Sequence, residues 1–150
     1  MVFLDHLKTL VVGSDHAGFE LKQHLKKSLP QLPWQDEGTF NTESVDYPDF
    51  ADKVCALVNP PMVAGVLICG SGQGMAIRAN RHKHIRAALC WHEEIARLAR
   101  AHNDANVLCL GARTMDYKVC VQVLNTFLTT GFEGGRHAGR VDKLSVSPRQ

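Results

Sequence analysis

The sequence places a cysteine directly before a glycine-rich turn. An apolar run at 65–68 leads through Cys69 into the turn 70–74, and residues 75–80 can begin a helix. Glycines let a ligand approach the main chain, and the free N–H groups at a helix start attract anionic oxygen. The same groups can lower the pKa of a thiol, so Cys69 could act as a base or nucleophile. The alternative is that Cys69 is a small buried hydrophobic residue before a tight turn.

Polar side chains follow two other apolar runs. Asp15 and His16 come shortly after the run 9–13, and Arg113 follows the run 106–110. Asp15 has two interpretations: a helix cap that accepts backbone N–H groups, or a catalytic group at the end of a strand. His16 adds a second titratable group at the same place.

His102 lies on the apolar face of an amphipathic helix, seven residues after Ile95. We therefore expect its side chain to point toward the protein body. It is either a core histidine bonded to a carbonyl or a functional group, and the polar residues Asn103 and Asp104 at the helix end favour function.

Arg136 and Arg140 stand four residues apart in the glycine-rich segment 131–140. If a helix begins in this segment, both guanidinium groups lie on one face. Guanidinium groups suit bidentate binding of phosphate, although most arginines on a surface are simply solvated.

The segments that carry these side chains are predicted to alternate between strands and helices. The apolar runs predict five strands, at 9–13, 34–37, 65–68, 86–90 and 106–110. We expect an α/β fold: a doubly wound five-stranded parallel sheet, as in Rossmann-like and flavodoxin-like three-layer sandwiches. Ligands bind outside the carboxyl ends of such strands, so Asp15, Cys69 and Arg113 should lie close together. The wide apolar face of the helix over 119–128 predicts a subunit contact.

Composition limits the classes of function. A chain of 150 residues with 45% hydrophobic content predicts a single domain over 1–150. A net charge of +2 without a basic stripe argues against nucleic-acid binding. No apolar run approaches the roughly 18 residues of a membrane span, so no membrane is expected. Five cysteines without a C-x-x-C pair suggest neither disulfides nor a zinc site, which favours a cytoplasmic protein.

Five motifs in order resemble the B-type ribose-5-phosphate isomerases, a family shared with the subunits of galactose-6-phosphate isomerase. The likeness covers about residues 11–140, and the motifs span residues 13–18, 46–51, 69–74, 102–106 and 133–140. It implies interconversion of D-ribose 5-phosphate and D-ribulose 5-phosphate through a cis-enediolate in the pentose phosphate pathway. No metal or organic cofactor is expected.

The resemblance also implies roles for residues. Cys69 would move the proton between C1 and C2, His102 would open the furanose ring, and Asp15 would contact substrate and assist catalysis. Met75 stands where members without the cysteine have glutamate, which favours Cys69 as the base. The remaining substrate-binding residues would be His16, Gly70, Ser71, Gly72, Gln73, Gly74, Asn103, Arg113, Arg136 and Arg140, with the arginines chiefly on phosphate. The family implies a homodimer, possibly a tetramer, with active sites at the interface.

Three alternatives stay open. The substrate could be a 6-phosphohexose, such as allose or galactose 6-phosphate. A nucleotide-binding module without catalysis could use the turn 70–74, but that turn lacks the G-x-G-x-x-G spacing. A metal site could use some of the eight histidines and five cysteines, but their spacing does not resemble a ligand set. The sequence does not say which subunit supplies His102 and the arginines.

Overall fold

Five parallel strands form one sheet in the order β2-β1-β3-β5-β4. The structure is a computed structural model that describes residues 2–148. The strands are β1 (Thr9–Ser14), β2 (Trp34–Asp36), β3 (Val63–Cys69), β4 (Ala87–Leu89) and β5 (Val107–Gly111). The chain runs from β1 to β2 on one side of β1 and then crosses back from β2 to β3 on the other side, so its direction of progress along the sheet reverses. The predicted doubly wound parallel sheet is therefore confirmed.

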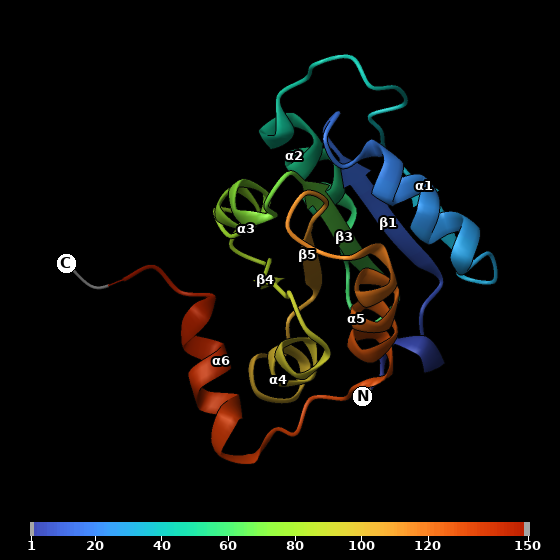
Figure 1. Ribbon diagram of the computed structural model, residues 1–150. Coiled ribbons are helices and arrows are strands. Elements are labelled where there is room, and N and C mark those ends of the chain that lie inside the picture. Colours follow the sequence, from blue (N-terminus) through green and yellow to red (C-terminus); the bar gives the residue numbers. More distant parts are fainter. Residues whose placement is uncertain (1, 149–150) are drawn as a thin grey trace.

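Helices cover both faces of the sheet (Figure 1). The main helices are α1 (Phe19–Ser28), α2 (Tyr47–Leu57), α3 (Gln73–Ala79), α4 (Glu93–Asn103), α5 (Tyr117–Thr129) and α6 (Ala138–Leu144). Short 3₁₀ turns, η1 (Phe3–Asp5) and η2 (Gly135–His137), precede β1 and α6. Side chains of α1, α4 and α5 share one core cluster, while those of α2 and α3 share the other, so the sheet lies between two helical layers.

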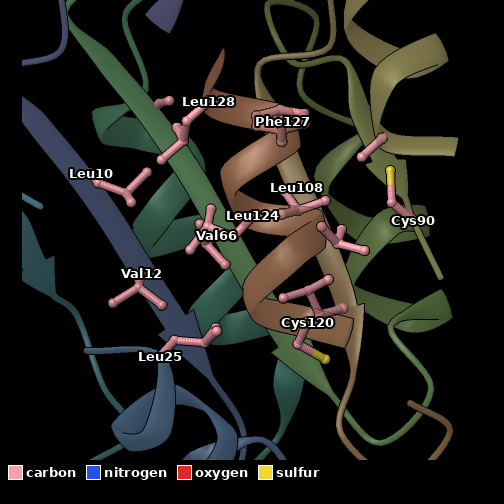
Figure 2. Close-up of a cluster of buried hydrophobic side chains, with 14 of the residues drawn as sticks. Leu10, Val12, Leu25, Val66, Cys90, Leu108, Cys120, Leu124, Phe127 and Leu128 are labelled. Atoms are coloured by element: carbon pink, nitrogen blue, oxygen red, sulfur yellow. The ribbon is translucent and has the colours of Figure 1, made fainter. Parts of the chain in front are cut away.

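Alternation along the strands divides the core into these two clusters. Leu10 and Val12 of β1 face α1, α4 and α5, whereas Val11 faces α2 and α3. The same alternation holds in β3 and β5 because successive side chains of a strand point to opposite faces. Figure 2 shows the larger cluster, in which Leu124 and Phe127 of α5 pack beside Val66 and Leu108.

The structure does not support the predicted subunit contact through the helix over 119–128. Its main apolar residues are fully or almost fully buried within the single chain: Cys120, Val123, Leu124, Phe127 and Leu128. Part of the cover comes from η1, where the ring of Phe3 stacks on Phe127 with 6.0 Å between centroids. This apolar face is therefore core and gives no support for an oligomer.

Several element boundaries differ from the sequence prediction. The fourth strand covers only 87–89, because it lies at the sheet edge and pairs with β5 alone. The helix after the glycine-rich turn begins earlier than predicted, at Gln73. Within residues 2–148, every helix is too short or too polar to cross a bilayer.

Candidate active site

A cavity of about 550 Å³ opens at the carboxyl ends of β1, β3 and β5. Parallel strands bring their carboxyl ends to one edge of the sheet, so residues distant in sequence meet there. The cavity is lined by Asp15, Tyr47, Cys69, Gly70, Ser71, Gly74, Arg113 and Thr114. The predicted convergence of Asp15, Cys69 and Arg113 is therefore present in the structure.

Cys69 ends β3 and lies at the wall of this cavity. The residue is only 4% exposed, and its Sγ accepts a hydrogen bond from the Gly72 N–H at 3.2 Å. Gly72 is also the N-cap of α3, so the sulfur lies at the N-terminal end of that helix. An N–H donor at a sulfur stabilises the thiolate, the form that can act as a base.

The other four cysteines occupy the core. Burial raises the pKa of Cys55 and of Cys90 to about 12, and that of Cys120 to about 11. Burial also raises the pKa of Cys109 well above its ordinary value. These four thiols therefore stay protonated near neutral pH. Cys69 differs from them because it lines the cavity and accepts the Gly72 N–H.

Asp15 combines its two predicted roles. Its Oδ1 accepts a hydrogen bond from the Gly18 N–H at 3.0 Å, so the carboxylate orders the turn that leads into α1. Gly18, not Asp15, occupies the N-cap position of α1. Asp15 is 6% exposed and lines the cavity, where it can contact a ligand.

His16 does not line the cavity but forms a hydrogen bond to a neighbouring loop. Its Nδ1 accepts a hydrogen bond from the Val45 N–H at 3.2 Å, so a neutral ring carries its proton on Nε2. Val45 belongs to the segment between β2 and α2 that delivers Tyr47 to the cavity. His16 therefore links the end of β1 to the loop before Tyr47.

Glycine is required at two positions of the turn 70–74. Gly72 adopts φ +78°, a conformation that side chains with Cβ rarely take. A Cβ on Gly74 would lie 2.4 to 2.7 Å from the ring and hydroxyl of Tyr47. Tyr47 thus packs directly on the backbone of the turn and closes one side of the cavity. Ser71 also orders the turn, because its Oγ accepts from the Gln73 N–H at 3.4 Å.

Arg113 is attached to the glycine-rich turn through the main chain. Its N–H donates to the Gly70 carbonyl at 2.9 Å, and the Ala112 N–H donates to the Cys69 carbonyl at 2.9 Å. These bonds continue the β3–β5 pairing beyond the strand ends. The exposed Arg113 side chain therefore supplies a positive charge at the mouth of the cavity.

His102 forms a second cluster, with His137 and Glu133. The two imidazole rings stack with 4.2 Å between centroids and 13° between planes. A carboxylate oxygen of Glu133 lies 3.6 Å from Nε2 of His102 and 3.7 Å from Nε2 of His137. Burial, together with nearby positive charges, lowers the pKa of His137. The side chain of His102 is 34% exposed, so it is not the core histidine that its apolar helix face suggested.

Arg136, Arg140 and Asn103 lie near this second cluster. Arg136 belongs to η2 and Arg140 to α6, the two helical turns on either side of His137, and both side chains are exposed. Asn103 ends α4 and lines a separate cavity of about 410 Å³ beside Arg86 and Leu144. Two of the predicted phosphate ligands therefore stand beside the predicted ring-opening histidine.

The two clusters lie at opposite ends of the sheet within one chain. Helix α4 follows the carboxyl end of β4 and runs back to the amino end of β5, as the order of elements requires. Its 11 residues span about 16 Å at the rise of an α-helix. Figure 1 shows α6 far from the strand ends near α2. One chain therefore does not gather all the predicted residues around one cavity.

The His102 cluster does not have the geometry of a metal site. The nearest potential ligand atoms of His102, Glu133 and His137 lie within 4.8 Å of one another. An imidazole nitrogen binds a metal ion that lies in the plane of its ring. The planes of His102 and His137 are nearly parallel, at 13°, and the ring centroids are 4.2 Å apart. One ion therefore cannot lie in both ring planes unless one of the rings rotates.

Four residues of these clusters were not among the predicted site residues. Tyr47 and Thr114 line the cavity, while His137 stacks on His102 and Glu133 faces both rings. Tyr47 falls inside the motif at 46–51, and Glu133 and His137 fall inside the motif at 133–140, which is the signal that could have identified them.

Comparison with known proteins gives consistent matches over almost the whole chain. Residues 10–144 match the family model described as ribose/galactose isomerase. Ribose-5-phosphate isomerase B of Escherichia coli is 37% identical over 143 residues, which cover 93% of this chain and 96% of that protein.

Solved structures agree in fold as well as in sequence. Ribose 5-phosphate isomerase B from Anaplasma phagocytophilum superposes with a TM-score of 0.89 at 51% identity, covering 93% of this chain and 97% of that one. The Mycoplasma genitalium enzyme, solved with bound ribulose-5-phosphate, has a TM-score of 0.83 at 39% identity and covers 92% and 94% of the two chains.

Proposed function

This chain belongs to the ribose/galactose isomerase family, and we propose that it interconverts D-ribose 5-phosphate and D-ribulose 5-phosphate through a cis-enediolate. Relatives named ribose-5-phosphate isomerase B support this substrate. The bound ribulose-5-phosphate of the Mycoplasma genitalium structure favours a pentose phosphate over a 6-phosphohexose. The five free cysteines accord with a cytoplasmic location.

Cys69 is the proposed base, and its position carries the proposal. An aldose–ketose isomerase must move a proton between neighbouring carbons, which needs a base beside the sugar. The sulfur of Cys69 meets the cavity and accepts the Gly72 N–H at 3.2 Å. A thiolate held in this way can remove the proton from C2 and return it to C1.

The turn 70–74 is proposed to stabilise the enediolate. Negative charge develops on the oxygens of C1 and C2 as the proton leaves, and fixed N–H donors stabilise such charge without reorganisation. Gly72 adopts φ +78° and Gly74 accepts the close contact of Tyr47, so the glycines give the turn its backbone conformation beside the cavity, where its N–H groups would bind the developing charge. Asp15, which lines the same cavity, would orient the sugar hydroxyls.

The second half of the site is proposed to come from another copy of the chain. His102, Asn103, Arg136 and Arg140 lie too far from Cys69 to meet the same sugar within one subunit. In a homodimer with two-fold symmetry, each copy can place this cluster over the cavity of its partner, which forms two equal sites. His102 would then open the furanose ring.

The phosphate is proposed to bind where the two halves meet. Arg113 would approach it from the cavity, and Arg136 and Arg140 would approach from the partner copy. Guanidinium groups bind phosphate through paired N–H donors, so three of them would hold a dianion firmly. His137 lies between the two partner arginines in sequence and would stand beside the same phosphate.

A coupled assay with ribose 5-phosphate in the presence of chelator tests this function. The proposal expects chelator-resistant formation of ribulose 5-phosphate and much slower turnover of allose or galactose 6-phosphate. Turnover of a 6-phosphohexose at a higher kcat/KM would identify the alternative substrate. Absence of isomerisation of all three sugars would reject the proposal.

A further inference from the structure

Arg100 is a fully buried arginine on α4, with 0% of its side chain exposed. Its guanidinium lies over the ring of Phe3, 4.2 Å from the centroid, and 5.7 Å from that of Phe127. Burial lowers the pKa of Arg100, and the carboxylate of Asp104 opposes that effect. A buried charge is costly unless it is paired, so the partners of Arg100 indicate what it stabilises.

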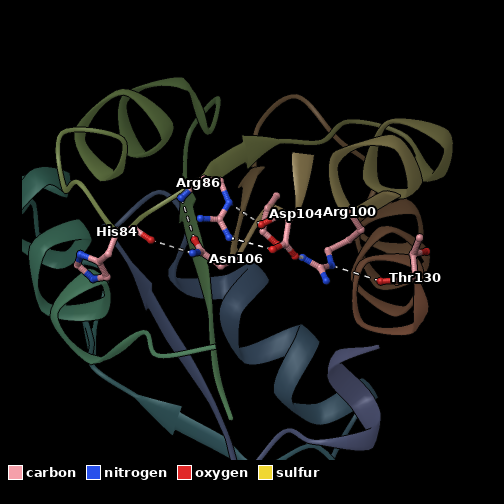
Figure 3. A network of polar contacts seen from close by, with 7 residues as sticks. His84, Arg86, Arg100, Asp104, Asn106 and Thr130 are labelled. Atoms are coloured by element: carbon pink, nitrogen blue, oxygen red, sulfur yellow. Dashed lines mark hydrogen bonds and ion pairs between the residues drawn. The ribbon is translucent and has the colours of Figure 1, made fainter. Parts of the chain in front are cut away.

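The first partners of Arg100 lie in the turn that follows α4. Nη1 of Arg100 donates to Oδ1 of Asp104 at 2.9 Å and to the Ala105 carbonyl at 2.5 Å (Figure 3). Asp104 is the C-cap of α4 and adopts φ +47°, an unfavourable conformation for a residue with Cβ. Arg86 adds bonds to the Asp104 carbonyl and carboxylate. This network fixes the turn that directly follows His102 and Asn103.

The second partner begins the segment that carries the arginines. Nε of Arg100 donates to the Thr130 carbonyl at 3.3 Å, at the end of α5. Three residues later, the Glu133 N–H donates to the Ala101 carbonyl at 2.9 Å, so the segment stays attached to α4. Arg136 and His137 follow in η2, where His137 stacks on His102.

We propose that Arg100 is a positioning residue that joins the C-terminal end of α4, which carries His102, to the segment carrying Arg136 and Arg140. We call the contacts of Arg100 with Asp104, Ala105 and Thr130 the joint. Because of this joint, the ring-opening group and the phosphate ligands approach the substrate as one rigid unit. The inference rests on the proposed function for its kinetic consequences, whereas the joint itself can be tested without turnover.

Amide hydrogen exchange tests the joint directly. In Arg100→Met, the protection of the Glu133 amide should fall at least about tenfold, while amides of β1 and β3 keep their protection. Arg97→Met is the matched control, because Arg97 lies one turn earlier on the same helix and forms an exposed pair with Glu94. Its exchange pattern should match that of the wild type.

Kinetics test the link to function. Arg100→Met and Asp104→Asn should raise the KM for ribose 5-phosphate and lower kcat, with a fall in kcat/KM of at least about tenfold. Asp104→Asn keeps a residue that tolerates positive φ but removes the carboxylate. Arg100→Lys should recover part of the loss. Cys69 should react with iodoacetamide at the wild-type rate in every variant, because the other half of the site is intact. A role in stability alone would lower the melting temperature without changing the KM of the folded enzyme.

Wild-type KM, kcat and Glu133 protection in folded Arg100→Met or Asp104→Asn would overturn the inference. If Arg100→Met does not fold, Asp104→Asn and Arg100→Lys decide by the same measurements. A wild-type protein that fails to isomerise ribose 5-phosphate would reject the proposed function instead, while the exchange data would still decide whether the joint exists.

Discussion

The imidazole rings of His102 and His137 stack face to face, with 4.2 Å between their centroids. One ring comes from the end of α4 and the other from η2, so the stack joins the proposed ring-opening group to the proposed phosphate segment. Both rings also face the carboxylate of Glu133. The stack makes the local stability depend on protonation.

Stability should fall on acidification because of His137. Burial, the His102 ring and nearby arginine charges lower the pKa of His137 below its ordinary value of 6.5. Below about pH 6.5 the unfolded chain then binds more protons than the folded chain, so stability decreases as pH falls. In urea unfolding at pH 7.5 and 5.5, His137→Gln should lose less stability than the wild type. The exposed His6→Gln is the control, and an unchanged pH effect in His137→Gln would contradict this assignment.

Iodoacetamide should label Cys69 selectively. Burial raises the pKa of Cys55, Cys90 and Cys120 to between about 11 and 12, so these thiols are protonated at pH 8. Mass spectrometry of the native protein should show one label per chain, with loss of activity and protection by ribose 5-phosphate. The variant Cys69→Ala should take up no label and should lose at least about a hundredfold in kcat, the scale of a positioned base. Labelling spread over several cysteines would contradict the assignment.

Gly74→Ala should damage the site through Tyr47. The new methyl group would lie within 2.7 Å of the Tyr47 ring, so the ring must move and the cavity wall changes. We expect a fall in kcat/KM and a partial recovery in the double variant Gly74→Ala/Tyr47→Ala, because the neighbour that clashes is gone. Gly139→Ala is a suitable control, since no atom lies within 4 Å of its added Cβ. Additive effects of the two substitutions at 47 and 74 would show that this contact does not limit activity.

Replacing either terminal arginine should weaken phosphate binding. Arg136→Ala or Arg140→Ala removes a charged hydrogen bond, which is worth about 1.5 to 3 kcal/mol, or roughly ten- to a hundredfold in kcat/KM. Lysine at either position should restore only part of the lost kcat/KM, because an ammonium group lacks the planar, two-pronged donor geometry of a guanidinium. Free ribose should be a poor substrate, and its turnover should be nearly the same in the variants as in the wild type. Equal losses on free and phosphorylated sugar would remove the arginines from the phosphate site.

The cavity residues were largely predictable because a simple rule places them. Asp15, Cys69 and Arg113 follow apolar runs, and the carboxyl ends of parallel strands meet at one edge. Tyr47 follows no strand, and its place depends on the loop that His16 holds through Val45. His137 was missed because its role arises from stacking on a ring distant in sequence.

The interpretation of α5 failed for a related reason. A wide apolar face on a helix predicts that other residues cover it, but the helical periodicity of the sequence does not say whether those residues belong to the same chain or to another subunit. Phe3, in a short turn before the first strand, packs on Phe127, and α1 and α4 cover further parts of the same face. The partner surface therefore lay within the same chain.

A heterodimer with one defect in each copy tests the split site most directly. One copy carries Cys69→Ala and the other His102→Ala, and two different affinity tags allow isolation of dimers that contain both. If the site combines Cys69 of one copy with His102 of its partner, one of the two sites is intact. The heterodimer should then show about half of the wild-type kcat with ribose 5-phosphate, while either homodimeric variant is nearly inactive. Activity no higher than that of the two homodimeric variants would contradict the shared site.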